Sequence, residues 1–220
     1  MRILRIKNIE QEFLIENGNI YNLNVEDPNV YVNIINACLS NDNDFLLYYD
    51  DSELKDFDKN SLFIGDVFSI DSNSKKSISS LYKNISEKVV SSDDKSALEQ
   101  INLKMLELLQ NIANKLDVST TFEDDLDFNK ILSLYKFSFS EDNSDIFLKF
   151  VNFVKSNFEI KNFKFIISVN VLSLFSNSQI DLLHKEFEYM GLTLININFV
   201  RKIKDSNVFN ITIDKDLCEY

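Results

Sequence analysis

A helical seam in the middle of this chain constrains its fold more than any other feature. Apolar residues recur there at alternating spacings of three and four, the repeat of a coiled-coil face; they are Leu98, Ile101, Met105, Leu108 and Ile112. Residues 77–90 carry a second helical stripe. We predict that the two helices form an antiparallel hairpin, and that residues 72–135 make a helical leg inserted into another domain.

The segments on both sides of this leg alternate between strand and helix patterns. Strand patterns occur at residues 3–7, 12–15, 20–25, 45–49, 62–70, 163–169, 192–199 and 208–213. Helical patterns occur at residues 26–39, 144–158 and 177–190. The pair Asn17-Gly18 predicts a hairpin turn, because both residues tolerate positive φ. Alternation of this kind favours a largely parallel sheet, so we predict an α/β head domain formed by residues 1–71 and 136–220.

The strand–turn–helix at residues 20–35 is the place where a nucleotide-binding fold carries its phosphate loop. Such a loop needs glycines and a lysine, but the turn here reads NVEDPNVYVN, with two acids and neither of those residue types. Negative charge at a helix start repels phosphate. The whole chain holds only three glycines. We therefore predict a degenerate phosphate loop and no ATP binding.

Catalytic side chains are scarce. His184 is the only histidine. No Ser or Cys has a plausible triad around it, and a two-histidine metal site is excluded. The carboxylates of one loop are the main option for a metal, and they are Glu123, Asp124, Asp125 and Asp127. Loops of this kind can bind calcium through several oxygens. The alternative is that these acids simply favour the start of the next helix.

Charge is segregated along the chain. The net charge of −12 disfavours nucleic acid, and residues 42–71 hold nine acids and two lysines. Residues 72–104 hold six lysines against four acids, and residues 147–164 hold four lysines against one acid. These lysines lie either on solvated helix faces or on a basic surface confined to one side of an acidic protein. The candidates for DNA contact are Lys75, Lys76, Lys83, Lys149 and Lys155.

The cellular location is read from what the sequence lacks. No run of about 18 apolar residues is present, so no segment is expected to span a membrane. The first residues lead straight into a strand pattern and do not resemble a signal peptide. The two cysteines, Cys38 and Cys218, have no metal-site spacing, which favours a reducing compartment. We expect a cytoplasmic protein.

Several stretches of the chain, in the same order and spacing, resemble a known family. They are ENGNIYNLNVEDPNVYVNIINACL (16–39), DDSELKDFDK (50–59), the segment from 62 to 89, and the segment from 163 to 199. The sequence is similar to the short form of the type II-A CRISPR adaptation protein, the Csn-two family. The resemblance implies an ATPase-like α/β head without a working phosphate loop, together with a helical leg.

The same resemblance implies a function. Members of this family form homotetrameric rings that bind double-stranded DNA ends without sequence preference during spacer acquisition in antiviral defence. They are not enzymes, and they work beside the CRISPR integrase proteins and the effector nuclease. Calcium is associated with the family, and we match it to Glu123, Asp124, Asp125 and Asp127. Two alternatives stay open: a carboxylate-metal-dependent nuclease, and a protein-interaction module that docks through its helical hairpin without binding DNA.

Overall fold

The computed structural model describes residues 2–7, 9, 12–42, 44–124, 126–140, 145–199 and 203–214. The chain forms two compact units, which we call the head (Met1–Ile70 with Asp142–Tyr220) and the leg (Asp71–Glu141). The sequence prediction placed the second boundary at 135/136. The leg extends further because Asn73 and Phe139 exchange hydrogen bonds: the Asn73 amide donates to the Phe139 carbonyl at 3.0 Å and Phe139 N–H donates to Asn73 Oδ1 at 2.9 Å.

A five-stranded sheet is the centre of the head. Its order is β6 (Ser61–Ile64), β7 (Phe165–Val169), β8 (Thr193–Phe199), β3 (Ile20–Val25) and β9 (Val208–Ile213). Each neighbouring pair runs parallel. The predicted α/β class with a largely parallel sheet is therefore confirmed.

A second, antiparallel sheet lies beside the first in the head. Its order is β2 (Glu12–Ile15), β1 (Arg2–Ile6), β4 (Leu46–Asp50) and β5 (Glu53–Lys55). The hairpin predicted at Asn17-Gly18 is wrong, because β2 and β3 belong to different sheets and β3 has β8 and β9 on its two sides. The tight hairpin instead joins β4 to β5 through Asp51 and Ser52, which both have positive φ.

Two further differences from the sequence prediction concern residues 56–60 and the strand expected at residues 62–70. The predicted strand at residues 62–70 ends early, because β6 stops at Ile64. The short helix α2 (Phe57–Asn60) precedes it, and Asp56 caps this helix by accepting from the Lys59 N–H at 3.3 Å. One of the acids counted in residues 42–71 thus starts a short helix by capping it.

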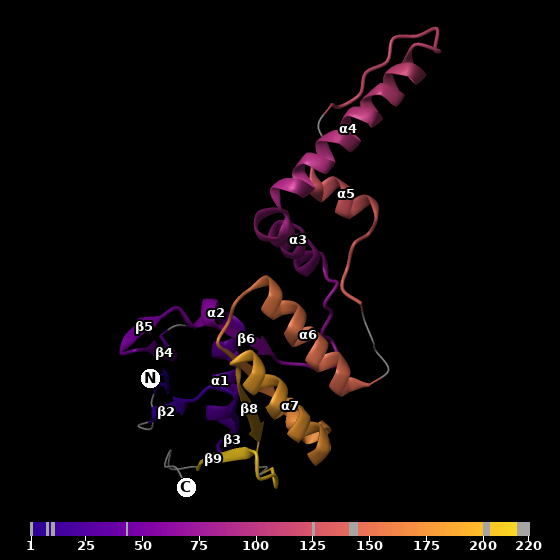
Figure 1. The fold of residues 1–220 in the computed structure, drawn as a ribbon. Helices are drawn as coiled ribbons and strands as arrows, with labels where there is room; N and C mark the ends of the chain where they lie inside the picture. Colours follow the sequence, from indigo (N-terminus) through magenta and orange to yellow (C-terminus); the bar gives the residue numbers. More distant parts are fainter. Residues whose placement is uncertain are drawn as a thin grey trace. The chain divides into compact units, whose positions relative to one another are not determined.

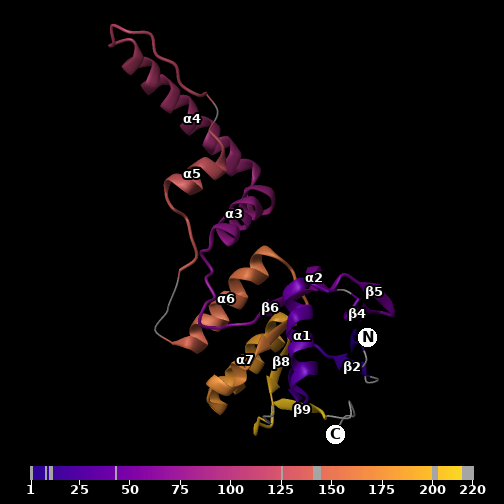
Figure 2. The same cartoon turned by 180° about the vertical axis from the view of Figure 1, so that it is seen from behind.

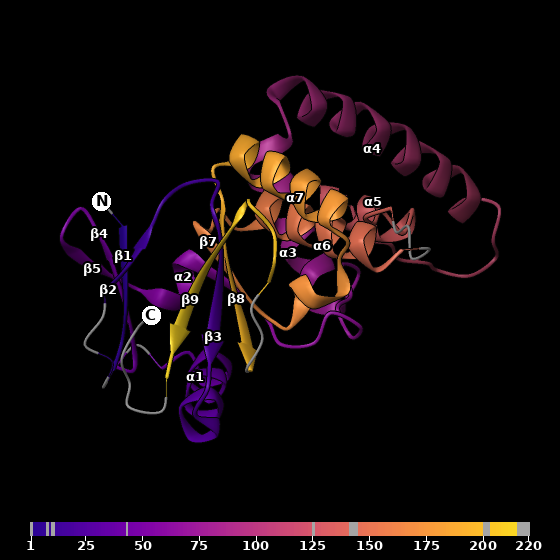
Figure 3. The ribbon, with the colours of Figure 1, turned by 90° about the horizontal axis from the view of Figure 1, so that it is seen from below.

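Helices and the second sheet cover the two faces of the parallel sheet. Helices α6 (Ile146–Ile160) and α7 (Asn177–Met190) pack on one face, as Figure 3 shows. The other face packs against α1 (Pro28–Ser40), α2 and the antiparallel sheet. Because both faces are covered, β7 is apolar and buried along most of its length.

The leg contains α3 (Lys75–Asn84), which runs into a π-helical turn (Ile85–Val89), then α4 (Ser92–Ala113) and α5 (Phe128–Leu134). The predicted antiparallel hairpin is wrong, since α3 and α4 do not lie side by side in Figures 1 and 2. Helix α3 packs on α5 instead, and the Tyr82 hydroxyl donates to the Leu132 carbonyl at 3.1 Å. None of the helices in the described residues is long and apolar enough to cross a membrane.

An extended return segment takes the place of the helix that was expected beside α4. The Asn102 amide donates to the Asp124 carbonyl at 2.8 Å, which ties this segment to one side of α4. Four of the five seam residues, Ile101, Met105, Leu108 and Ile112, remain 46–52% exposed. The sequence pattern therefore identified an apolar helix face correctly, but the described residues of the chain do not cover it.

Two glycines give a paired prediction about stability. Gly18 and Gly191 both have positive φ, at 83° and 65°. A Cβ at Gly191 meets nothing within 4 Å, whereas one at Gly18 would lie 3.0 Å from the Glu188 Cα. We expect Gly191→Ala to lower the free energy of unfolding by about 1 kcal/mol, and Gly18→Ala to lower it by clearly more. Urea unfolding measures both, and equal losses would contradict the steric argument.

Candidate DNA-binding residues and the degenerate phosphate loop

The turn between β3 and α1 shows what replaces a phosphate loop. Asp27 caps α1, and its Oδ1 accepts the N–H groups of Asn29 at 2.8 Å and Val30 at 2.9 Å. Pro28 has no N–H, and the Glu26 N–H donates to the Ile213 carbonyl at 2.9 Å. A bound phosphate needs these helix-start amides, and here a carboxylate of the chain already occupies them.

Three of the candidate lysines lie on α3 in the leg. Lys75 and Lys76 are its first two residues and are exposed, and the first turn holds no acid. Among the described residues, neither amino group has a carboxylate within ion-pair distance. Lys83 lies seven residues after Lys76, so the two share a helix face. Its only described ion pair is a loose one with Glu87, at 3.9 Å.

The positive charges of Lys75 and Lys76 at the start of α3 are electrostatically unfavourable when no anion is bound there. The N-terminus of a helix carries partial positive charge, so cations there are destabilising by a few tenths of a kcal/mol to about 1 kcal/mol each. The cap is the neutral Ser74, whose hydroxyl accepts from the Ser77 N–H at 3.3 Å. An anion bound beside this turn would remove the repulsion.

The two candidates in the head are engaged by their own unit. Lys149 donates to the Phe68 carbonyl at 2.8 Å, and Lys155 forms an ion pair with Glu186 at 2.6 Å. They are six residues apart on α6, so they project from different sides of that helix. The structure therefore brings together the α3 lysines, but it does not bring Lys149 and Lys155 into one cluster.

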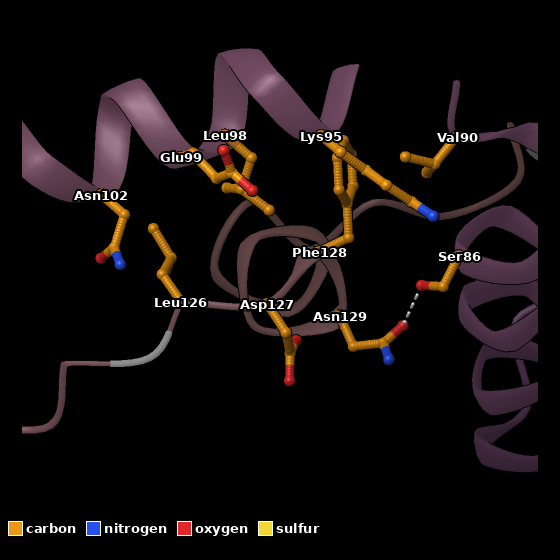
Figure 4. A pocket seen from close by; sticks show the side chains of 10 residues that line it. All are labelled: Ser86, Val90, Lys95, Leu98, Glu99, Asn102, Leu126, Asp127, Phe128 and Asn129. Atoms are coloured by element: carbon orange, nitrogen blue, oxygen red, sulfur yellow. Dashed lines mark hydrogen bonds between the residues drawn. The ribbon is translucent and has the colours of Figure 1, made fainter. Parts of the chain in front are cut away.

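A pocket of about 420 Å³ in the leg includes a lysine that the sequence reasoning missed. Its lining residues are Ser86, Val90, Lys95, Leu98, Glu99, Asn102, Leu126, Asp127, Phe128 and Asn129. Figure 4 shows Lys95 pointing toward Ser86 and Val90, where Ser86 donates to Asn129 Oδ1 at 2.8 Å. Three separate segments meet here, so no local sequence signal could have indicated the pocket.

The carboxylates of the acidic loop are mostly engaged with the leg itself. Lys130 lies 2.8 Å from Glu123, and its hydrogen bond and charge lower the pKa of that carboxyl. Asp127 caps α5 by accepting from the Lys130 N–H at 2.7 Å, and Asp125 lies outside the described residues. No group of three acidic, His or Cys side chains in the described residues could hold a metal ion. The described members of this loop thus do not make a calcium site by themselves.

Cys38 and His184 are the cysteine and the histidine that the structure describes. Burial raises the pKa of the Cys38 thiol to about 12, so the reactive thiolate is absent at neutral pH. His184 is half-buried on α7.

These features define a class of protein: an α/β head whose helix-start amides are capped by Asp27, with a helical leg inserted into the chain. No protein-family model matches the sequence, and no curated protein matches it. The solved structure of Stu0660 of Streptococcus thermophilus is similar at a TM-score of 0.56 and 15% sequence identity, over 96% of this chain and 74% of that one. This chain therefore has the fold of Stu0660.

A second solved structure is similar at a lower level. It is the ADP conformation of MJ1267, an ATP-binding cassette of an ABC transporter, with a TM-score of 0.40 and 14% sequence identity, over 90% of this chain and 82% of that one.

Proposed function

We propose that this protein is a non-catalytic homotetrameric ring that binds double-stranded DNA ends during CRISPR spacer acquisition. The observation that carries the proposal is the similarity to Stu0660, a CRISPR-associated protein of the Csn-two family, which extends over both head and leg. The colinear sequence stretches that resemble the same family support it independently. The Asp27 cap supports a head that neither binds nor hydrolyses ATP.

The α3 lysines support the DNA-binding part of the proposal. Lys75 and Lys76 are exposed cations at a helix start that lacks acids, and phosphate is the ligand that such a position favours. Contacts to phosphates carry no sequence information, which agrees with binding to DNA of any sequence. The remaining charge of the chain is strongly acidic, so we expect DNA to enter only where these lysines line the surface.

The exposed seam of α4 supports self-association through the leg. Ile101, Met105, Leu108 and Ile112 follow the coiled-coil repeat and remain about half exposed. An uncovered apolar stripe of this kind typically marks a protein–protein contact. The seam also favours the second candidate function, a protein-interaction module without DNA binding.

The remaining parts of the proposal come from the resemblance. We propose the CRISPR integrase proteins and the effector nuclease as partners, the cytoplasm as the location, and calcium as a ligand that stabilises the ring. The measurement that bears on the ring and on calcium is the solution mass with calcium and with excess chelator. A monomeric mass in both conditions would contradict the tetramer.

Linear and closed-circular duplexes of equal length and sequence test the proposed function. We expect tight binding to the linear form, weak binding to the closed circle and no change in affinity when the sequence is scrambled. Affinity should fall by about 0.9 log unit per log unit of salt for each phosphate neutralised. Equal affinity for both forms would contradict end binding, absence of binding would favour the interaction module, and cleaved DNA would favour the nuclease.

A further inference from the structure

Polar side chains cross the face of the parallel sheet that α6 and α7 cover. Because side chains alternate along a strand, this face takes every second residue of each strand, and register places them in two rows. The inner row is Ser168, Asn196, Asn22 and Asn210, and the outer row, nearer the carboxyl ends of the strands, is Asn198, Asn24 and Thr212. Figure 3 shows the strands that carry the outer row side by side.

The inner row is satisfied within the sheet. Asn196 Oδ1 accepts from the Ser168 hydroxyl at 3.0 Å and from the Val171 N–H at 2.9 Å. The Asn196 amide donates to Asn22 Oδ1 and the Asn22 amide donates to Asn210 Oδ1, both at 3.0 Å. Polar groups buried in a sheet are normally partnered in this way.

The outer row is different. Asn24, Asn198 and Thr212 are 3%, 1% and 3% exposed, and the buried atoms Asn24 Oδ1, Asn198 Oδ1 and Thr212 Oγ1 have no hydrogen-bond partner in the described residues. Leaving such an atom unpaired costs about 1–3 kcal/mol. The Asn198 amide donates to Asn22 Oδ1. Exchanging the nitrogen and oxygen of the Asn198 side chain would therefore place its Oδ1 against Asn22 Oδ1, with no hydrogen between them. Within the described residues, these three oxygens are therefore left for a ligand to meet.

The chemistry of the surroundings indicates which ligand this is. All three unpartnered atoms are oxygens, and carboxylates directly follow two of the strands: Glu26 after β3 and Asp214, only 9% exposed, after β9. A buried water could also pair with these oxygens, but neighbouring negative charge favours a cation over a neutral molecule. Sets of oxygen ligands alone suit hard cations.

We propose that the side-chain oxygens of Asn24, Asn198 and Thr212 bind a hard cation in the head. The site lies at the carboxyl ends of the parallel strands, where open α/β sheets bind their ligands. It is separate from the acidic loop of the leg and does not depend on the proposed DNA binding. The cation binds the folded head and not the unfolded chain, so it stabilises the fold by mass action.

Unfolding of the full chain in different salts tests this proposal. The protein is chelated, dialysed into tetramethylammonium chloride and unfolded with urea in the presence of Ca²⁺, Mg²⁺, Na⁺ or K⁺ at constant ionic strength. We expect at least one cation to shift the unfolding equilibrium toward the folded state, by about 100-fold when its concentration is 100 times its dissociation constant. The four salts distinguish the ions that share this chemistry.

Three variants test whether the stabilisation by a cation comes from the outer row. Thr212→Val keeps the side-chain shape but removes the oxygen, so it should abolish the cation effect. Thr193→Val is the matched control, because Thr193 is equally buried in the same sheet but its hydroxyl already donates to the Glu16 carbonyl at 2.7 Å. It should lower stability and retain the cation effect. Asn24→Asp adds a charge to the site and should enlarge the cation effect while lowering stability in tetramethylammonium.

The outcomes separate the proposal from its rivals. If no cation stabilises the wild-type chain, the outer row holds water and the proposal is overturned. If the cation that stabilises the wild type stabilises Thr212→Val and Asn24→Asp to the same extent, the ion binds elsewhere, and the proposal is equally overturned. Loss of DNA binding or of the tetramer leaves this test unaffected, because its readout is unfolding alone.

Discussion

Replacing both Lys75 and Lys76 with Glu is expected to weaken binding to linear duplex DNA by on the order of 100-fold at low salt. The two lysines are exposed, adjacent and free of ion pairs within the described residues. The change removes two attractive charges and introduces two repulsive ones at the same place. Lys75→Gln with Lys76→Gln should reduce the salt slope by about two, because about 0.9 is lost for each phosphate contact.

Because of the helix dipole, weaker DNA binding by this variant cannot be explained by unfolding. Glutamates at the first two positions of α3 are favourable where lysines are not, by a few tenths of a kcal/mol to about 1 kcal/mol each. The variant should therefore unfold no more easily than the wild type. Weaker DNA binding in a protein of equal or greater stability can be assigned to the lost contacts.

Lys104→Glu with Lys115→Glu is the matched control. Both residues are exposed in the leg but lie away from α3, and the change in net charge is identical. We expect this control to lose much less affinity, measured by gel shift and fluorescence anisotropy at matched salt. If the two double variants lose the same affinity, the net charge of the chain sets DNA binding, and α3 is not the contact.

Phe165→Ala is expected to lower the free energy of unfolding of the head by about 3–5 kcal/mol. Phe165 is fully buried on β7, and its ring centroid lies 4.9 Å from that of Tyr48 and 5.6 Å from that of Phe57. The ring thus joins the parallel sheet to the antiparallel sheet and to α2. Removing it leaves a cavity between these elements that rigid sheets cannot close.

Phe209→Ala is the comparison for this second prediction. Phe209 is 52% exposed on β9, and its ring centroid lies 5.5 Å from that of Tyr21. We expect its truncation to cost much less, and urea unfolding measures both. Because a loss of 3–5 kcal/mol approaches the whole stability of a domain, Phe165→Leu supplies a milder change at the same position. Equal losses for Phe165→Ala and Phe209→Ala would refute the assigned role of the Phe165 ring.

The sequence by itself determined the elements whose signals are local. Helix α7 ends at Gly191, as predicted, because glycine adopts the left-handed conformation of a helix cap without strain. Helix α1 starts beside Asp27 and Pro28, as the turn indicated, and β9 spans 208–213 as its apolar run predicted. The absence of glycine and lysine from the turn before α1 was also readable in the sequence, because these residues would all lie within one turn.

Only the tertiary structure decided how these elements combine. The turn at Asn17-Gly18 leads from the antiparallel sheet into the parallel sheet, because β3 pairs with β8 and β9, which are more than 160 residues away in the chain. Asn24, Asn198 and Thr212 are ordinary polar residues in the sequence, and only strand register places them in one buried row. The exposure of the α4 seam also appeared only in the structure, because a periodic pattern specifies which face is apolar but not whether anything covers it.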